Sequence, residues 1–401
     1  MNESTTVVPI KDNPICRLRE AMRQEMRTCI EQVVWEEFEA ALGAPCHERT
    51  DERRGYRHGC YERHLLTAGG EVTLTMPRGR MEQPDGSRRE WRSAVVPKDQ
   101  RRCRDIDEAI LGCYLGGINT RRIRRSLAPL LGPKSLSKST ISRLVARLKE
   151  HFEAWRRRDL TEEHYRVVYL DAMRLRVRLA RRVLSVPVQA VVGVRPDGQK
   201  VLVALGIAPS ESTGAWKAVV EDLARRGLAA PALGVVDGNA GLLASIAAVW
   251  PDAHVQRCTK HKLENLLAKA PKHAHGELRR DYRAITQAES LAQADRAYTA
   301  FCRKWRPLCA SVVESIEEAG PHLLTFYRFP RSQWKSLRTT NPIERVNEEF
   351  RRRVKTQGSF STEQAALVLL YGLIAAGQIR LNKIAGCRDM PAATAPLNNA
   401  A

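Results

Sequence analysis

The sequence has no apolar run approaching eighteen residues, the length that a membrane-crossing helix requires. Its first residues, MNESTTVVPIKDNP, lack the basic start and apolar core of a secretory signal. CxxC pairs are also missing, and ten scattered cysteines in a chain of 401 residues fit reduced thiols better than a disulfide framework. We therefore expect a cytoplasmic protein without a membrane partner.

Acidic side chains are few relative to basic ones. The 45 Asp and Glu residues against 66 Lys and Arg residues leave a net charge of +21. This excess favours a polyanionic partner, and nucleic acid is the leading candidate. The length allows two or three domains with a sizeable core, which excludes a peptide or a bare linker.

The first hundred residues predict a helical region over 1–54 and a small β unit over 55–100. Four side chains at helical spacing indicate one face of an amphipathic helix over 15–42: Met22, Met26, Cys29 and Val33. Apolar residues then alternate with threonines after the Gly69-Gly70 turn signal, a pattern typical of strands.

Residues 101–155 predict three short helices in a helix-turn-helix pattern, with Thr120 and Ser137 as the N-caps of the second and third. In the third helix Ile141, Leu144, Val145 and Leu148 form the inner face. The outer face would then be free to contact DNA through Ser139, Ser142, Arg143 and Arg147. An ordinary three-helix core with a solvated basic face fits the same pattern.

Residues 160–258 predict the order β β β α β α β, with strand candidates RVVYLD, LRVRLA or its continuation into VPVQAVVGV, KVLVALGIA, ALGVVDG and HVQRC. This order indicates an α/β domain with a mixed sheet and looks like the ribonuclease H fold. Residues 259–335 read as an all-α insertion domain. The last helices of the catalytic domain follow over 336–387, at 341–357 and 362–383, and a disordered tail is expected over 388–401.

Two aspartates stand where apolar strands are predicted to stop, Asp171 after RVVYL and Asp237 after ALGVV. Carboxylates at the ends of neighbouring strands can converge on one cation. A third acid, Glu344, lies in the first turn of a helix that begins at TTNPIERVNEEF, with Asn341 predicted as N-cap and Pro342 as the first helical residue. A capping box uses a glutamate at the same place, which is the alternative role for Glu344, and Glu348 and Glu349 are fallback candidates.

Several segments in one order carry a family resemblance: GYRHGCYERHLLTAGGEVTLTMPRGR, YLGGINTRRIRRSL, DAMRLRVR, VGVRPDGQKVLVALGIAPSEST, VVDGNAGL, VQRCTKHKLENLL and TTNPIERVNEEFRRR. Together they resemble the IS256, or Mutator-like, family of prokaryotic insertion-sequence transposases over about residues 55 to 375. The resemblance implies a DDE transposase in which Asp171, Asp237 and Glu344 form the catalytic triad. It also implies that Cys258 and His261 are the family's CxxH signature.

One position departs from the family pattern, since Glu264 stands where an arginine usually precedes the asparagine, here Asn265. This puts a local charge contact, and with it activity, in doubt. The family assignment does not depend on that residue.

A triad of carboxylates can hold two Mg²⁺ or Mn²⁺ ions that activate the attacking oxygen and stabilise the leaving oxygen. The expected partner is double-stranded DNA, as terminal inverted repeats and target DNA, and the expected location is the cytoplasm in association with the nucleoid. Joining two element ends needs at least two active sites, which favours a homodimer or larger assembly. Arg351, Arg352, Arg353 and Lys355 follow the third acid and are expected to bind DNA phosphates.

The Cys258 and His261 pair also suggests the hypothesis of a zinc site, with His273 and His275 as the other ligands. Its spacing is not that of a known finger, and a buried thiol beside a hydrogen-bonded histidine is the simpler account, so zinc is not expected.

Three rival readings remain open. One is a DNA-binding regulator that has lost catalysis. Another is a phosphatase with a strand-end aspartate nucleophile, although Met173 occupies the position of the second acid that this class needs. The third is a recombinase that uses a covalent tyrosine.

Overall fold

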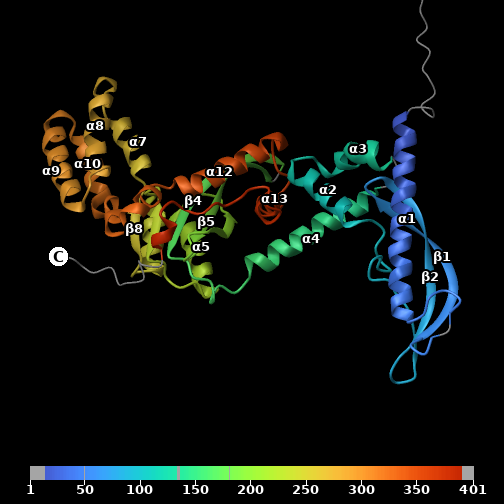
Figure 1. Cartoon of the computed structure of the whole chain (residues 1–401). Helices are drawn as coiled ribbons and strands as arrows, with labels where there is room; N and C mark the ends of the chain where they lie inside the picture. The colour runs from blue at the N-terminus through green and yellow to red at the C-terminus, as the bar shows by residue number, and fades with distance from the viewer. Residues whose placement is uncertain (1–13, 49, 133–135, 180, 391–401) are drawn as a thin grey trace, which may run out of the picture. The chain divides into compact units, whose positions relative to one another are not determined.

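The computed structural model describes residues 14–48, 50–132, 136–179 and 181–390, and it combines helices with two sheets (Figure 1). The chain divides into two compact units, Met1–Arg147 and Leu148–Ala401. Each unit is described by itself below.

The first unit begins with helix α1 (Pro14–Leu42), followed by an antiparallel sheet of β1 (Gly55–Thr67), β2 (Gly70–Glu82) and β3 (Arg88–Glu90). The predicted inner face of α1 is wrong in part, because Met22 is 53% and Val33 47% exposed. The helix instead buries Val34, Phe38 and Leu42, which recur every four positions. Met26 lies on the same series and contacts the Thr67 hydroxyl, whereas Cys29 and Val33 are one residue away from it.

Three further helices follow in the first unit: α2 (Arg104–Leu115), α3 (Thr120–Leu131) and α4 (Lys138–Arg156), the last of which extends into the second unit. Their shared core includes Ile110, Ile123, Ile141 and Leu144, as the apolar pattern predicts. The Ser137 hydroxyl accepts from the Thr140 amide and caps α4. Thr120 is the first helical residue of α3, so the position before the helix falls on Asn119 rather than on Thr120.

The second unit is built on a five-stranded mixed sheet with the strand order β6-β5-β4-β7-β8. Strands β4 (Val167–Leu179), β5 (Arg182–Val194) and β6 (Lys200–Ile207) are antiparallel neighbours. Strands β7 (Leu233–Val236) and β8 (His254–Arg257) add in parallel on the other side of β4. The order of strands and helices along the chain agrees with the predicted one.

The predicted end of the first of these strands is wrong. Strand β4 continues through Asp171 to Leu179, so RVVYLD and LRVRL are one strand, and the chain reverses between Leu179 and Arg182. What stops near Asp171 is the parallel pairing with β7, whose last pair on β4 is Tyr169 with Val235.

Helices α5 (Thr213–Arg225) and α6 (Ala240–Val249) cover one face of the sheet. Trp216 and Ile246 pack there against Val168 and Leu170 of β4. Because side chains alternate along a strand, Tyr169 and Asp171 point to the opposite face. The Asp171 carboxylate therefore belongs to this second face of the sheet.

Helix α12 (Asn341–Val354) and helix α13 (Glu363–Ala375) pack on that second face, and α12 contacts β4 directly. Helix α13 ends eight residues before the predicted residue 383. The expected tail begins with a short 3-10 turn, η7 (Cys387–Asp389), and Met390 is buried. Residues 391–401 lie outside the described part of the chain.

Between β8 and α12 the described chain is helical, as predicted for the insertion. Figure 1 shows its four longer helices gathered beyond β8: α7 (Thr259–Lys269), α8 (His275–Thr286), α9 (Leu291–Leu308) and α10 (Ala310–Ala319). Short pieces complete it: η2 (Lys272–Ala274), η3 (Gly320–Leu323), η4 (Thr325–Arg328), η5 (Arg331–Gln333) and α11 (Trp334–Leu337).

A charged cluster ties these helices to the sheet. Arg257 at the end of β8 and Lys262 on α7 are 4% and 2% exposed, and both donate to the Glu318 carboxylate on α10, at 2.7 and 2.8 Å. Burial raises the pKa of Glu318, but these two donors outweigh it and lower the pKa to about 2. The buried cations therefore have a partner that stays ionised.

Within the described residues, no helix is long and apolar enough to cross a membrane.

Replacing Glu318 with Gln should lower the midpoint of urea unfolding at pH 7, because two buried cations lose their anion. A carboxyl with a lowered folded-state pKa stabilises the fold above its unfolded pKa, near 4.5, and this stabilisation disappears as the pH falls toward 2. The difference between wild type and variant should accordingly shrink below pH 4.5. A difference that does not change with pH would contradict this role, and Glu314→Gln on the same helix is the control.

Candidate active site

Asp171 and Asp237 come together through the parallel pairing of β4 and β7. The last pairs are Val168 with Gly234 and Tyr169 with Val235, so two further steps along both strands bring Asp171 alongside Asp237. The two carboxylates interact electrostatically, and each belongs to the face opposite α5 and α6. The structure thus brings together the two acids that the sequence predicts.

The Asp171 carboxylate is largely buried. Burial first, and the negative charge of Asp237 second, raise its pKa to about 6. Asn347 on α12 donates from Nδ2 to Asp171 Oδ2 at 2.8 Å and is itself 1% exposed. Sequence reasoning missed Asn347, although its position three residues after Glu344 places both side chains on one helical face.

The Asp237 carboxylate is fixed by the turn that follows β7. Its Oδ1 accepts from the Asn239 amide at 2.9 Å, and Asn239 in turn caps α6 through the amides of Gly241 and Leu242. Gly238 has a φ of +100°, and a Cβ there would lie 2.5 Å from the Arg257 guanidinium. Any other residue would strain the turn and displace Arg257.

Glu344 lies in the first turn of α12, and its side chain is 15% exposed. Thr340 precedes the helix, so the cap is one residue earlier than the predicted Asn341. In a capping box the Glu344 carboxylate would accept from the backbone amide of the cap residue. The Thr340 amide donates to Cys258 Sγ instead, so the capping-box alternative does not describe the contacts. Glu344 Oε1 accepts from the Thr340 hydroxyl at 2.7 Å, and Oε2 accepts from Lys260 Nζ at 2.7 Å.

The fallback acids make other contacts. Glu349 pairs with Arg352 at 2.5 Å, and Glu348 is exposed. Glu344 is therefore the acid of α12 that faces the end of β8.

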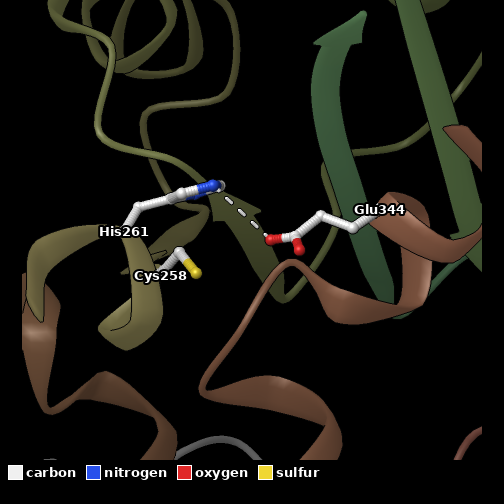
Figure 2. A group of neighbouring side chains, drawn as sticks. All are labelled: Cys258, His261 and Glu344. Atoms are coloured by element: carbon white, nitrogen blue, oxygen red, sulfur yellow. Dashed lines mark ion pairs between the residues drawn. The ribbon is translucent and has the colours of Figure 1, made fainter. Parts of the chain in front are cut away.

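Figure 2 shows Cys258, His261 and Glu344 gathered where β8 leads into α7. His261 Nε2 lies 3.6 Å from Glu344 Oε1, and His261 also interacts electrostatically with Asp171. The hydrogen bond with Cys258 raises the pKa of His261 to about 9. His261 of the CxxH signature thus interacts with both the third acid and Asp171.

The histidines that the zinc reading named are placed differently. His275 Nε2 contacts the Ala270 carbonyl at 3.1 Å, and His273 belongs to η2. Among the described residues, Glu344 is the group that joins Cys258 and His261. Glu264, the departure from the family pattern, is exposed on α7, where its charge raises the pKa of Lys260 after the larger effect of Glu344.

The residues predicted to contact DNA through the third short helix are all exposed on α4: Ser139, Ser142, Arg143 and Arg147. Ile141 and Leu144, on the other side of this helix, are buried. Val145 and Leu148, the other two residues of the predicted inner face, are half-buried, so the predicted division of the faces is confirmed in part. DNA contact stays a prediction.

The basic run after the third acid lies at the end of α12 and in η6 (Lys355–Gln357). Arg351, Arg352 and Lys355 are exposed. Arg353 is half-buried and donates to the Gln378 carbonyl at 3.1 Å, so part of its capacity is used inside the fold. Phosphate contact by these four residues also stays a prediction.

Comparison with known proteins bears on this arrangement of acids. The family model described as "Transposase, Mutator family" matches residues 3–379. The chain belongs to this family. A transposase for insertion sequence element ISRM5 of Rhizobium meliloti (strain 1021) is 34% identical over 354 residues, which are 88% of this chain and 87% of that protein.

Other members of the Mutator family are similarly related. The transposase for IS1081 of Mycobacterium tuberculosis is 34% identical over 89% of this chain and 84% of its own length. The transposase for IS256 in transposon Tn4001 of Staphylococcus aureus is 29% identical over 85% and 86%. The solved Drosophila P element transposase strand transfer complex aligns with a TM-score of 0.27 at 12% identity over 68% of this chain and 79% of that chain, which is too low to support an argument.

A transposase of this family is expected to use a divalent metal ion, and the residues present fit one. Asp171 and Asp237 offer only oxygen donors, which Mg²⁺ and Mn²⁺ prefer. Their repulsion, together with burial, is what raises the pKa of Asp171. A cation between them would relieve that repulsion.

Replacing Asp171 with Asn should stabilise the metal-free protein. Because burial and Asp237 raise the pKa of Asp171 from 3.8 to about 6, ionised Asp171 destabilises the fold above pH 6, and this penalty disappears below pH 4. Urea unfolding at pH 7.5 should show a gain on the order of 2 to 3 kcal/mol. Mg²⁺ should stabilise wild type more than the variant. Loss of stability in Asp171→Asn would contradict the repulsion, and Asp252→Asn in an exposed turn is the control.

Proposed function

We propose that this transposase binds the terminal inverted repeats of an insertion sequence and catalyses metal-dependent strand cleavage and strand transfer by DDE chemistry. Asp171, Asp237 and Glu344 are the three acids. The observation that carries the proposal is the pairing of β4 with β7, which aligns Asp171 with Asp237 on the face that α12 covers.

The catalytic domain is assigned to the ribonuclease H-like class. Support comes from three antiparallel strands followed by two parallel strands, with the first acid on the central strand β4 and the second directly after β7. The helices from α7 to α11 interrupt this domain between the second and third acids. The third acid then arrives on a helix rather than on a strand.

In the proposed reaction, water attacks a phosphodiester at the element end and the 3′ hydroxyl leaves. That hydroxyl then attacks a phosphodiester of the target DNA, so one bond forms as another breaks and no protein nucleophile is needed. Two divalent ions held by Asp171, Asp237 and Glu344 would activate the attacking oxygen and stabilise the leaving one. Asn347 keeps Asp171 Oδ2 in place through its 2.8 Å hydrogen bond.

Two basic surfaces are assigned to DNA binding, one in each unit. The exposed face of α4 with Ser139, Ser142, Arg143 and Arg147 is suited to read the terminal repeats. The second surface, at the end of α12 and in η6, is suited to bind phosphates. It consists of Arg351, Arg352, Arg353 and Lys355. Since both element ends must be joined, the working form is assigned as a homodimer or larger assembly.

The test is incubation of the full chain with end DNA of its own element and Mg²⁺ or Mn²⁺, followed by separation of nicked and joined strands. Asp237→Asn and Glu344→Gln should each lower cleavage by about 10²-fold or more, because each removes a charged metal ligand. Glu348→Gln, an exposed acid on the same helix, should cleave like wild type.

Two outcomes would contradict the proposal. Cleavage that survives in Asp237→Asn would remove Asp237 from the site. Wild type that binds end DNA but never cuts it would favour the DNA-binding regulator instead.

A further inference from the structure

The cluster of Cys258, His261 and Glu344 contains three different kinds of metal ligand. One ligand atom from each residue lies within 4.8 Å of the others, and no other group of this kind occurs among the described residues (Figure 2). A thiolate, an imidazole and a carboxylate are the ligands of zinc, whereas Mg²⁺ prefers oxygen alone. Three protein ligands also leave a fourth position for water, as in many zinc sites.

The spacing of the ligands suits a tetrahedral ion. His261 Nε2 and Glu344 Oε1 are 3.6 Å apart, which is longer than a hydrogen bond. Nitrogen and oxygen ligands at about 2.0 to 2.1 Å from one tetrahedral zinc ion would lie roughly 3.3 Å apart. A small adjustment of two side chains would therefore close the site.

Thr340 supports all three ligands from outside. Its amide donates to Cys258 Sγ at 3.4 Å, and its hydroxyl donates to Glu344 Oε1 at 2.7 Å. The same hydroxyl lies 3.5 Å from His261 Nδ1. Partners of this kind orient ligands and raise metal affinity.

A cation is already attracted to this position. Lys260 Nζ lies 2.7 Å from Glu344 Oε2, and its side chain is 48% exposed. An exposed lysine can swing into solvent when a divalent ion takes its place. An incoming ion would therefore displace the Lys260 ammonium from Glu344.

We propose that Cys258, His261 and Glu344 form a Zn²⁺ site that shares Glu344 with the proposed Mg²⁺ site. Cys258 binds as the thiolate and His261 as the neutral imidazole, and the protons that they give up on binding pass to solvent. Zinc at this position takes the carboxylate that the proposed DDE site requires, so it should inhibit strand cleavage. The inhibition depends on the proposed function, whereas zinc binding itself does not.

The test uses the full reduced chain without DNA, titrated with Co²⁺ as a spectroscopic substitute for zinc. We expect a near-ultraviolet thiolate-to-Co²⁺ charge-transfer band, with visible bands of tetrahedral intensity that Zn²⁺ abolishes. Cys258→Ser should lose the charge-transfer band. Cys60→Ser, at an exposed cysteine of β1, should keep it.

Two further variants protect the test against a folding defect in Cys258→Ser. His261→Gln and Glu344→Gln keep the thiol and should weaken Zn²⁺ binding by at least about tenfold. Absence of the charge-transfer band in wild type, or its persistence in Cys258→Ser, would overturn the site.

The cleavage assay then tests the inhibition. Zn²⁺ added at constant Mg²⁺ should inhibit wild type, and Cys258→Ser should need more Zn²⁺ for the same inhibition. Zinc binding without inhibition would overturn the competition for Glu344. Loss of all cleavage at any metal composition, with the Co²⁺ spectrum intact, would instead count against the proposed function.

Discussion

The close approach of Asp171 and Asp237 is the constraint on which the second unit depends. Two carboxylates on adjacent strands repel each other, and burial strengthens the effect until the pKa of Asp171 reaches about 6. Neighbouring elements supply a hydrogen-bond donor and a positive charge to Asp171. Asn347 donates to Asp171, and His261 adds a favourable charge from α7. Such an arrangement lowers stability and prepares a site for a cation.

The path of the chain explains how a distant residue reaches this pair. The Thr259 amide at the start of α7 donates to the Arg338 carbonyl at 2.9 Å, just before α12. The Thr340 amide likewise donates to Cys258 Sγ. The helices between these points therefore leave the sheet and return to the same place. Hydrogen bonds at the two ends of this helical segment thus hold Glu344 beside the end of β8.

Much of this organisation could be predicted from the sequence. Apolar runs and helical periodicity locate the strands and helices of the second unit, and the β4 and β7 segments already direct attention to Asp171 and Asp237. The hairpin after β4 could not be located, because the reversal between Leu179 and Arg182 has no Gly, Asn or Pro to mark it. The prediction of the inner face of α1 failed at Met22 and Val33, because these residues are as apolar as the residues that the sheet covers.

Contacts within the candidate site required the structure. The position of Asn347 three residues after Glu344 places it on the same helical face, but only the structure shows that this face packs against Asp171. The meeting of Glu344 with Cys258 and His261 joins residues about eighty positions apart, and no periodicity connects them. Local patterns report local structure, whereas a site shared by β4, β7, α7 and α12 depends on how these elements pack.

Asp171, Asp237 and Glu344 are proposed to hold the divalent metal together. Crystals soaked in Mn²⁺ and measured at its absorption edge would test it most directly, through the positions of the anomalous scatterers. We expect a peak between Asp171 and Asp237 within about 2.2 Å of a carboxylate oxygen of each, with Glu344 at the same metal centre in the DNA-bound enzyme. A map with no peak at the Asp171 and Asp237 pair, or with Mn²⁺ bound only elsewhere, would contradict it.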